Sequence, residues 1–308
     1  METNILLENG TNELEILEFS IDGNCYGINV AKIREILPYQ TVTPIPNSHT
    51  SIEGIFMPRD TMITVINLPR ELGLKESANT SNDMMIITNF NNLNIAFHVQ
   101  SVMGIHRVSW ADIITPDKTI NTKESSIATG IVKINGKIII ILDFEKIVSD
   151  INPETGLKVS DIDALGERKR SDSTILIAED SALLSTLIVD SLHKAGYVNV
   201  IKNVNGQEAW DKLCEMKADG SVLDKVKCII TDIEMPLMDG HRLTKLVKSD
   251  EVLQNIPLVI FSSLVNDEMK AKGASLGADA QLSKPEIGNL VKIIDGLINR
   301  YDIKVGLI

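Results

Sequence analysis

One acidic residue, Asp232, follows a short apolar stretch, residues 226–231, that is rich in Val, Ile and Thr and that we interpret as a buried strand. Pro236 and Gly240 then predict a loop, because both residues interrupt regular structure. A carboxylate at the carboxyl end of a strand lies at the rim of an open α/β sheet, where ligands bind. Such a carboxylate can attack a phosphoryl group as a nucleophile and form an aspartyl-phosphate.

Other polar side chains stand at the ends of further strand-like stretches in the same half of the chain: Glu179 and Asp180 after residues 174–178, Ser262 after residues 258–261, and Lys284 after residues 278–283. If these strands are parallel neighbours joined by helices, their carboxyl ends share one edge. Three acids at one edge repel one another, so the site needs a cation, and carboxylate oxygens suit Mg²⁺. Lys284 and Ser262 would offer a charge and a hydroxyl to a phosphoryl group.

Each of these residues also has an ordinary structural role. An Asp before Met and Pro is usually a turn residue, and Lys followed by Pro usually marks a loop boundary. A pair of acids before Ser commonly starts a helix, because negative charge there interacts favourably with the helix dipole. Their order along the chain, each after an apolar stretch, favours one shared site over five unrelated roles.

The ordered set resembles the receiver domain of two-component response regulators, over residues 172–302. The resemblance implies a doubly wound, flavodoxin-like α/β fold with a parallel five-stranded sheet. It also implies that Asp232 is the phospho-acceptor, with Ser262 and Lys284 as the other catalytic residues. The expected Mg²⁺ ligands are Asp180, Asp232, the main-chain carbonyl of Glu234 and, through a water molecule, Glu179.

Two positions depart from that family's pattern. Glu179 stands where many receivers carry Asp, and its longer side chain changes the reach of the water-mediated contact. Gln281 stands three positions before Lys284, where the family has a switch aromatic. We therefore expect phosphorylation to be read through the loop that carries Ser262 instead.

The N-terminal half is a series of short strand-like stretches separated by turns. The predicted strands are residues 15–21, 25–30, 61–67, 83–89, 93–99 and 137–142. Turns are predicted at residues 22–24, 91–92 and 135–136, and residues 32–37 have brief helical spacing. Short strands at close spacing favour small barrels or a sandwich. This half has no nucleophile motif, acid–base pair or glycine-rich phosphate loop, which indicates a binding module.

That half resembles the CheW family of chemotaxis coupling proteins, over about residues 12–150. The stretches that carry the resemblance are residues 26–36, 45–46, 52–55, 102–110, 129–131 and 142–145, together with Arg59. The resemblance implies two five-stranded, barrel-like β-subdomains that share a core. It also implies partner-binding roles for Glu35, Gly54 and Arg59. Family members have Gly where this chain has Asp60, so we expect a different local turn.

The composition of the chain limits which other kinds of function are possible. A formal net charge of −12 argues against nucleic acid as a partner, because binding phosphates needs a basic face. The chain contains no apolar stretch of about 20 residues and starts without a basic-then-apolar signal, so we expect no membrane insertion. Three unpaired cysteines and five scattered histidines indicate a cytoplasmic protein without a cysteine or histidine metal site.

We expect a CheW-like domain over residues 12–150, a polar linker over 151–171 and a receiver over 172–302. This order of domains resembles the CheV family. That resemblance implies a cytoplasmic adaptor at receptor arrays that couples methyl-accepting receptors to the CheA histidine kinase. Phosphorylation of Asp232 would adjust the coupling, so the chain would turn over no metabolite. A phosphate sink, a protein that drains phosphoryl groups from CheA, would need the same residues. This function stays open as an alternative. A transcriptional response regulator would need a basic DNA-binding domain, which the acidic, β-rich N-terminal half does not offer.

Overall fold

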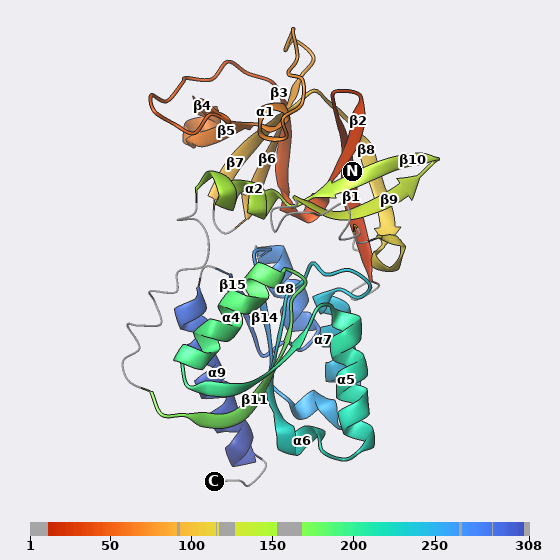
Figure 1. Cartoon of the computed structure of the whole chain (residues 1–308), viewed down its shortest axis with the longest axis vertical. Coiled ribbons are helices and arrows are strands. Elements are labelled where there is room, and N and C mark those ends of the chain that lie inside the picture. Colours follow the sequence, from red (N-terminus) through yellow and green to blue (C-terminus); the bar gives the residue numbers. More distant parts are fainter. Residues whose placement is uncertain are drawn as a thin grey trace. The chain divides into compact units, whose positions relative to one another are not determined.

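The computed structural model describes residues 12–90, 93–114, 116, 127–152, 168–264, 267–284 and 286–304. The chain divides into two compact units, which we call the N-terminal unit, Leu14–Thr155, and the C-terminal unit, which includes Gly156–Ile308 (Figure 1). None of the helices in these described ranges is long and apolar enough to cross a membrane.

The C-terminal unit is built on a five-stranded sheet in the order β12-β11-β13-β14-β15, in which all neighbouring strands are parallel. Its strands are β11 (Ser171–Ala178), β12 (Tyr197–Asn203), β13 (Val226–Thr231), β14 (Leu258–Ser262) and β15 (Ala280–Ser283). The predicted parallel α/β arrangement is therefore confirmed. Since every strand runs in the same direction, all five carboxyl ends lie along one edge.

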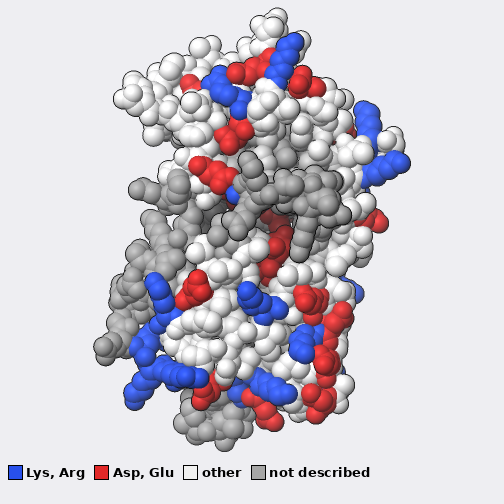
Figure 2. All heavy atoms as spheres, viewed as in Figure 1, with Lys and Arg blue, Asp and Glu red and all other residues white. Residues whose placement is uncertain are grey.

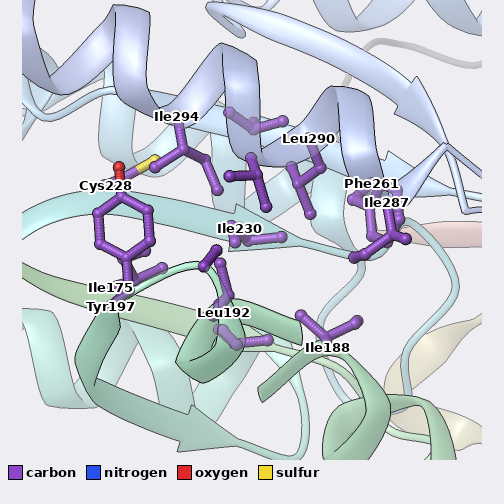
Figure 3. Close-up of a cluster of buried hydrophobic side chains, with 14 of the residues drawn as sticks. Ile175, Ile188, Leu192, Tyr197, Cys228, Ile230, Phe261, Ile287, Leu290 and Ile294 are labelled. Carbon is purple, nitrogen blue, oxygen red and sulfur yellow. The ribbon is translucent and has the colours of Figure 1, made fainter. Parts of the chain in front are cut away.

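Helices connect these strands and cover both faces of the sheet. They are α4 (Ala182–Lys194), α5 (Gly206–Ala218), α6 (Val222–Lys225), α7 (Gly240–Ser249), α8 (Asp267–Ser275) and α9 (Ile287–Lys304), with a 3₁₀ turn, η5 (Leu253–Asn255). Figure 3 shows side chains of α4 and α9, such as Leu192 and Ile294, packed with Ile230 of β13 in one buried layer. This continuous apolar layer holds the strand ends, and hence the residues they carry, in fixed positions.

The N-terminal unit contains two five-stranded sheets, in the orders β8-β1-β2-β10-β9 and β3-β6-β7-β5-β4. The strands are β1 (Glu13–Ile21), β2 (Asn24–Asn29), β3 (Ile33–Pro38), β4 (Ile52–Phe56), β5 (Ile63–Asn67), β6 (Met84–Phe90), β7 (Leu93–Val99), β8 (Ser101–Ser109), β9 (Ala128–Ile134) and β10 (Lys137–Leu142). Short helices follow β5 and β10, namely α1 (Leu68–Glu71) and α2 (Phe144–Ile151), and 3₁₀ turns are η1 (Val30–Lys32), η2 (Pro58–Asp60) and η3 (Trp110–Asp112).

The two sheets share a hydrophobic core, as the resemblance implied. Phe144 of α2 packs its ring edge-on against Phe19 of β1 and Phe97 of β7, with centroids 6.2 and 4.6 Å away. These three fully buried rings belong to the first sheet, the second sheet and the helix. Edge-to-face packing of this kind adds to the stabilisation from apolar burial.

The helical interpretation of residues 32–37 is wrong. Helical structure is confined to η1, and Ile33–Pro38 forms β3, which pairs antiparallel with β6. Periodicity over six residues is too short to separate helix from strand. Here β6 supplies the hydrogen bonds, and the β-branched Ile33 and Ile36 fit a pleated surface. The predicted turn at residues 91–92 lies outside the described ranges, whereas Asp22 and Gly23 form the predicted tight turn with positive φ angles.

A buried histidine joins three parts of the second sheet. His98 of β7 is 4% exposed, and its Nδ1 lies 2.9 Å from Glu53 Oε1 while its Nε2 lies 2.8 Å from Asp83 Oδ2. The ring of Tyr39 stacks on the imidazole with a centroid distance of 4.2 Å. Burial alone would lower the pKa of His98, but the hydrogen bonds and charges of Glu53 and Asp83 outweigh it and raise the pKa. The ring therefore bridges two carboxylates, and these contacts favour its protonated form relative to a free histidine.

We expect replacement of His98 with Gln to destabilise the N-terminal unit by about 3 kcal/mol at pH 6, because it removes the charge between the buried Asp83 and the half-buried Glu53. Since the folded pKa is raised, the imidazolium contributes fully below the unfolded pKa of about 6.5, and its contribution is lost as pH rises through the folded pKa. Denaturant unfolding of the wild type from pH 6 to 9 should show this loss, and His98→Gln should not. The exposed His49→Gln is the control, and equal profiles for all three proteins would contradict the assignment.

Candidate functional site

The carboxyl edge of the parallel sheet gathers the predicted acidic residues. Carboxylate oxygens of Glu179, Asp180 and Asp232 all lie within 4.8 Å of one another. Glu179 and Asp232 are buried, and Asp180 is exposed. The Asp232 amide donates to the Ala178 carbonyl at 3.0 Å, which extends the pairing of β11 and β13 by one residue and sets the two strand ends side by side.

Lys284 is the cation of this cluster. Its Nζ lies 2.7 Å from Asp232 Oδ2 and 3.2 Å from Glu179 Oε2, and the residue is 5% exposed. Burial raises the pKa of Glu179 well above its ordinary value; the charge of Lys284 opposes this rise, and the charges of Asp232 and Asp180 add to it. Three carboxyl groups against one ammonium group leave negative charge at the site, which attracts a further cation.

Ser262 and Glu234 lie at the same edge. The fully buried Ser262 ends β14, and its carbonyl accepts a hydrogen bond from the Lys284 amide at 3.2 Å. Its hydroxyl oxygen accepts from the Leu264 amide at 3.3 Å, which ties it to the segment that leads to α8. Glu234 is half-buried, two residues after Asp232 in the loop before α7. The roles of both residues stay predictions, and Pro285 lies outside the described ranges.

Two glycines shape the loop between Asp232 and α7. A Cβ atom at Gly240 would lie 1.8 Å from the Asp232 carbonyl oxygen, and one at Gly206 would lie 2.6 Å from the Met238 carbonyl oxygen. The Gly240 amide donates to the Ile233 carbonyl at 2.9 Å, which folds the loop back over its own start. From the sequence, Gly240 indicates only an interruption, and Gly206, at the start of α5, gives no signal, because the contact that requires a glycine is tertiary.

Two family profiles match the two units. The CheW-like domain matches residues 15–152, and the response regulator receiver domain matches residues 175–295. Chemotaxis protein CheV3 of Helicobacter pylori is 31% identical to this chain over 94% of the chain and 96% of its own length. The chain belongs to the CheV family.

Other relatives agree with that family assignment. A second CheV family protein of Helicobacter pylori, CheV2, is 31% identical over 90% of this chain and 92% of its own length. Chemotaxis protein CheW of Thermotoga maritima is 27% identical and covers 98% of its own length but 49% of this chain. Relatives named CheV thus extend over both units, and the CheW relative extends over about the length of one.

The acidic cluster of this CheV family chain fits Mg²⁺ by its donor chemistry. All of its donors are carboxylate oxygens, which are the hard ligands that Mg²⁺ prefers, and no histidine or thiol belongs to the cluster. The exposed Asp180 leaves one side of the cluster open to water, and Mg²⁺ usually retains several water ligands.

The partner-binding candidates have different environments. Glu35 is half-buried in β3. Gly54 is buried in β4 at φ +152°, and a Cβ atom there would lie 2.2 Å from the Thr43 carbonyl oxygen, so the glycine lets residue 43 pair with β4. Arg59 is exposed in η2 between β4 and β5, and its φ of 52° and ψ of 47° are left-handed. Their roles in an interface stay predictions.

Proposed function

We propose that this CheV family chain couples methyl-accepting chemotaxis receptors to the CheA histidine kinase, and that phosphorylation of Asp232 adjusts the coupling. The observation that carries the regulated half of the proposal is the 2.7 Å contact of Lys284 with Asp232 inside the acidic cluster. The CheW-like match over residues 15–152 supports the coupling half. Association with receptor arrays at the cytoplasmic face of the membrane follows from these partners.

The proposed chemistry is transfer of a phosphoryl group from a phosphohistidine of CheA. A carboxylate oxygen of Asp232 attacks phosphorus, the phosphorus–nitrogen bond breaks, and the leaving nitrogen keeps the electron pair. Lys284 neutralises charge on the new acyl phosphate, and the Ser262 hydroxyl donates to one of its oxygens. The chain's catalysis is thus limited to its own phosphorylation and dephosphorylation.

Mg²⁺ would be held by Asp180, Asp232 and the Glu234 carbonyl, with Glu179 acting through a bound water molecule. The ion supplies charge neutralisation for the transferred group. Asp232 Oδ1 accepts a hydrogen bond from the Ile233 amide at 2.6 Å, and Oδ2 accepts one from Lys284. Both oxygens are therefore oriented before any ligand arrives, which favours attack in a single geometry.

Nucleic acid is not a proposed partner. On the face in Figure 2, Lys and Arg side chains are mixed with Asp and Glu, apart from a group of basic side chains at the lower left. The formal net charge of −12 also argues against binding to nucleic acid. Proteins whose surfaces also mix acidic and basic side chains are more suitable partners than nucleic acid.

Arg59 offers a direct test of the coupling surface. A left-handed conformation is unfavourable for any residue with a Cβ atom, and such strain is often kept where a side chain has a function. We expect Arg59→Asn to leave thermal stability equal or higher, because Asn tolerates this conformation. Affinity for CheA should nevertheless fall about tenfold or more, equivalent to about 1.4 kcal/mol. Calorimetric binding to CheA and thermal unfolding of the full chain measure both effects.

The control for that test is Lys133→Asn, which removes an exposed charge from β9 of the same unit. It should change neither binding nor stability. If Arg59→Asn binds CheA as the wild type does, Arg59 is a solubilising surface residue and the coupling surface lies elsewhere.

A further inference from the structure

A row of polar side chains crosses one end of the second sheet of the N-terminal unit, whose strand order is β3-β6-β7-β5-β4. Glu53 of the edge strand β4 accepts a hydrogen bond at 2.5 Å from the side-chain amide of Asn67, the last residue of β5. His98 of β7 lies between Glu53 and Asp83, the residue before β6. The Tyr39 amide, one residue after β3, donates to the Asp83 carbonyl at 2.9 Å. These five residues, which we call the polar belt, therefore connect all five strands.

Glu53 is the extra residue of a β-bulge in β4. Its neighbours Ile52 and Gly54 pair with consecutive residues of β5, so Glu53 has no pairing partner there. A bulge bends its strand and redirects a side chain. Here the redirected carboxylate lies in the belt, where its Oε1 contacts both His98 Nδ1 and Asn67 Nδ2. The belt therefore fixes the conformation of the bulge.

The bulge controls how β4 presents two of the candidate partner-binding residues. Gly54 follows Glu53 directly, and Arg59 lies in η2, which begins two residues after β4 ends. The Thr43 amide donates to the Ile55 carbonyl at 2.8 Å, and the Ile55 amide donates to the Thr43 carbonyl at 2.9 Å. This bridge lies next to Gly54, where the lack of a Cβ atom lets Thr43 approach. A change in the bulge would therefore move Gly54 and weaken the bridge.

The charge of His98 decides how many hydrogen bonds hold the belt together. An imidazolium carries a donor on each ring nitrogen, so it can donate to Glu53 and Asp83 at once. A neutral ring has one donor and one acceptor, so one of the two acids loses its hydrogen bond and faces a lone pair. Burial would lower the pKa of His98, but the two acids raise it overall, so this loss occurs as pH rises through the raised value.

Besides the two acids, three titratable groups lie in or beside the belt. Glu76 accepts from Asn67 Nδ2 at 2.9 Å and pairs with Arg70 of α1 at 2.7 Å. Their mutual hydrogen bond lowers the pKa of Glu76 and raises the pKa of Arg70, so both keep their charge. Burial raises the pKa of Tyr39 above its ordinary value, so its phenol stays neutral. A change in the belt between pH 6 and pH 9 is therefore assigned to His98.

We propose that His98 is a positioning residue for the coupling surface. Its protonated ring fixes the bulge of β4, and its deprotonation loosens Gly54 and the bridge to Thr43, which weakens binding to CheA. Coupling by this chain then depends on pH as well as on phosphorylation of Asp232. The inference rests on the proposed binding of CheA to the N-terminal unit.

The first test is calorimetric binding of CheA to the full chain from pH 6 to pH 9. Wild-type affinity should fall about fivefold over this range, a typical size for coupling between two sites. His98→Gln should bind about fivefold more weakly than the wild type at pH 6 and should not weaken further, because Gln carries no charge to lose. The exposed His49→Gln is the control and should follow the wild type.

Site-resolved hydrogen exchange separates positioning from a general loss of stability. In the wild type, the protection factors of the Thr43 and Ile55 amides should fall about fivefold from pH 6 to pH 9, while the amide of Ile86 in β6 keeps its protection. In His98→Gln, the Thr43 and Ile55 amides should have low protection at both pH values. An equal loss of protection at all three amides would show that His98 acts on stability alone and would overturn the proposal.

Glu53→Gln tests the belt without replacing His98. It removes one of the two charges that favour the protonated ring, so the fall in affinity for CheA should occur at lower pH than in the wild type. An unchanged pH profile in Glu53→Gln, or equal affinity of His98→Gln and the wild type at pH 6, would also overturn the proposal. Failure of the proposed function looks different, because the wild-type chain would then bind CheA at no pH.

Discussion

Replacement of Asp232 with Asn is expected to reduce phosphoryl labelling of the chain to background, with either phospho-CheA or acetyl phosphate and Mg²⁺ as donor. An amide is not a nucleophile at neutral pH, so the acyl phosphate cannot form. Asn retains the shape of Asp232 and an oxygen that can accept from the Ile233 amide, so the fold should persist. Incorporation of radiolabelled phosphate into the full chain measures the effect.

The control is Asp224→Asn, which changes an exposed acid of α6 in the same unit and should be labelled like the wild type. Continued labelling of Asp232→Asn at the wild-type rate would place the acceptor on another residue. The same variant separates coupling from a phosphate sink. In assembled complexes of receptors and CheA, altered kinase output with normal assembly supports regulated coupling, and unchanged output favours the sink.

Replacement of Lys284 with Met should destabilise the C-terminal unit in EDTA by about 3 kcal/mol or more, because it leaves buried acids without their cation. Mg²⁺ should restore much of the loss, since a ligand that binds the folded state stabilises it. The variant should also bind Mg²⁺ more tightly than the wild type, because the repulsion by Lys284 is gone. Denaturant unfolding with and without Mg²⁺ measures both effects.

Lys248→Met is the matched control for this experiment. Lys248 Nζ lies 2.7 Å from Asp279 Oδ2, the same distance as in the pair of Lys284 with Asp232, and Asp279 belongs to no cluster of acids among the described residues. Its loss should lower stability without creating any dependence on Mg²⁺. Equal responses of the two variants to Mg²⁺ would show that Lys284 does not balance a metal site.

The acidic edge and four strands of the C-terminal sheet were predictable from sequence because they depend on local patterns, whereas β12 was not predicted and the five-stranded sheet was implied by the resemblance to receiver domains. Buried parallel strands appear as apolar stretches, and the first polar residue after each stretch is the one presented at the edge. The stretch before Asp232 matches β13 residue for residue, and the one before Ser262 matches all but the last residue of β14. The resemblance to the CheW family supplied the two-sheet arrangement of the N-terminal unit.

Residues 32–37 and His98 mark where sequence reasoning failed or gave no signal. The first stretch became β3 because β6 offers it a partner far along the chain, and six residues of local pattern cannot express that. His98 is one of five scattered histidines in the sequence, and only folding places it between Glu53 and Asp83. In both cases, contacts between residues far apart in the sequence determined the structure.

In the sequence, side-chain type and local periodicity determined the residues at the carboxyl edge, and the resemblances to the CheW and receiver families implied the two-domain order and the parallel sheet. Only the tertiary structure decided that Lys284 contacts both Asp232 and Glu179, and that Gly240 and Gly206 are required for the loop. These features are distances between segments that are far apart in the chain. Close packing sets such distances, and no local pattern of residues records them.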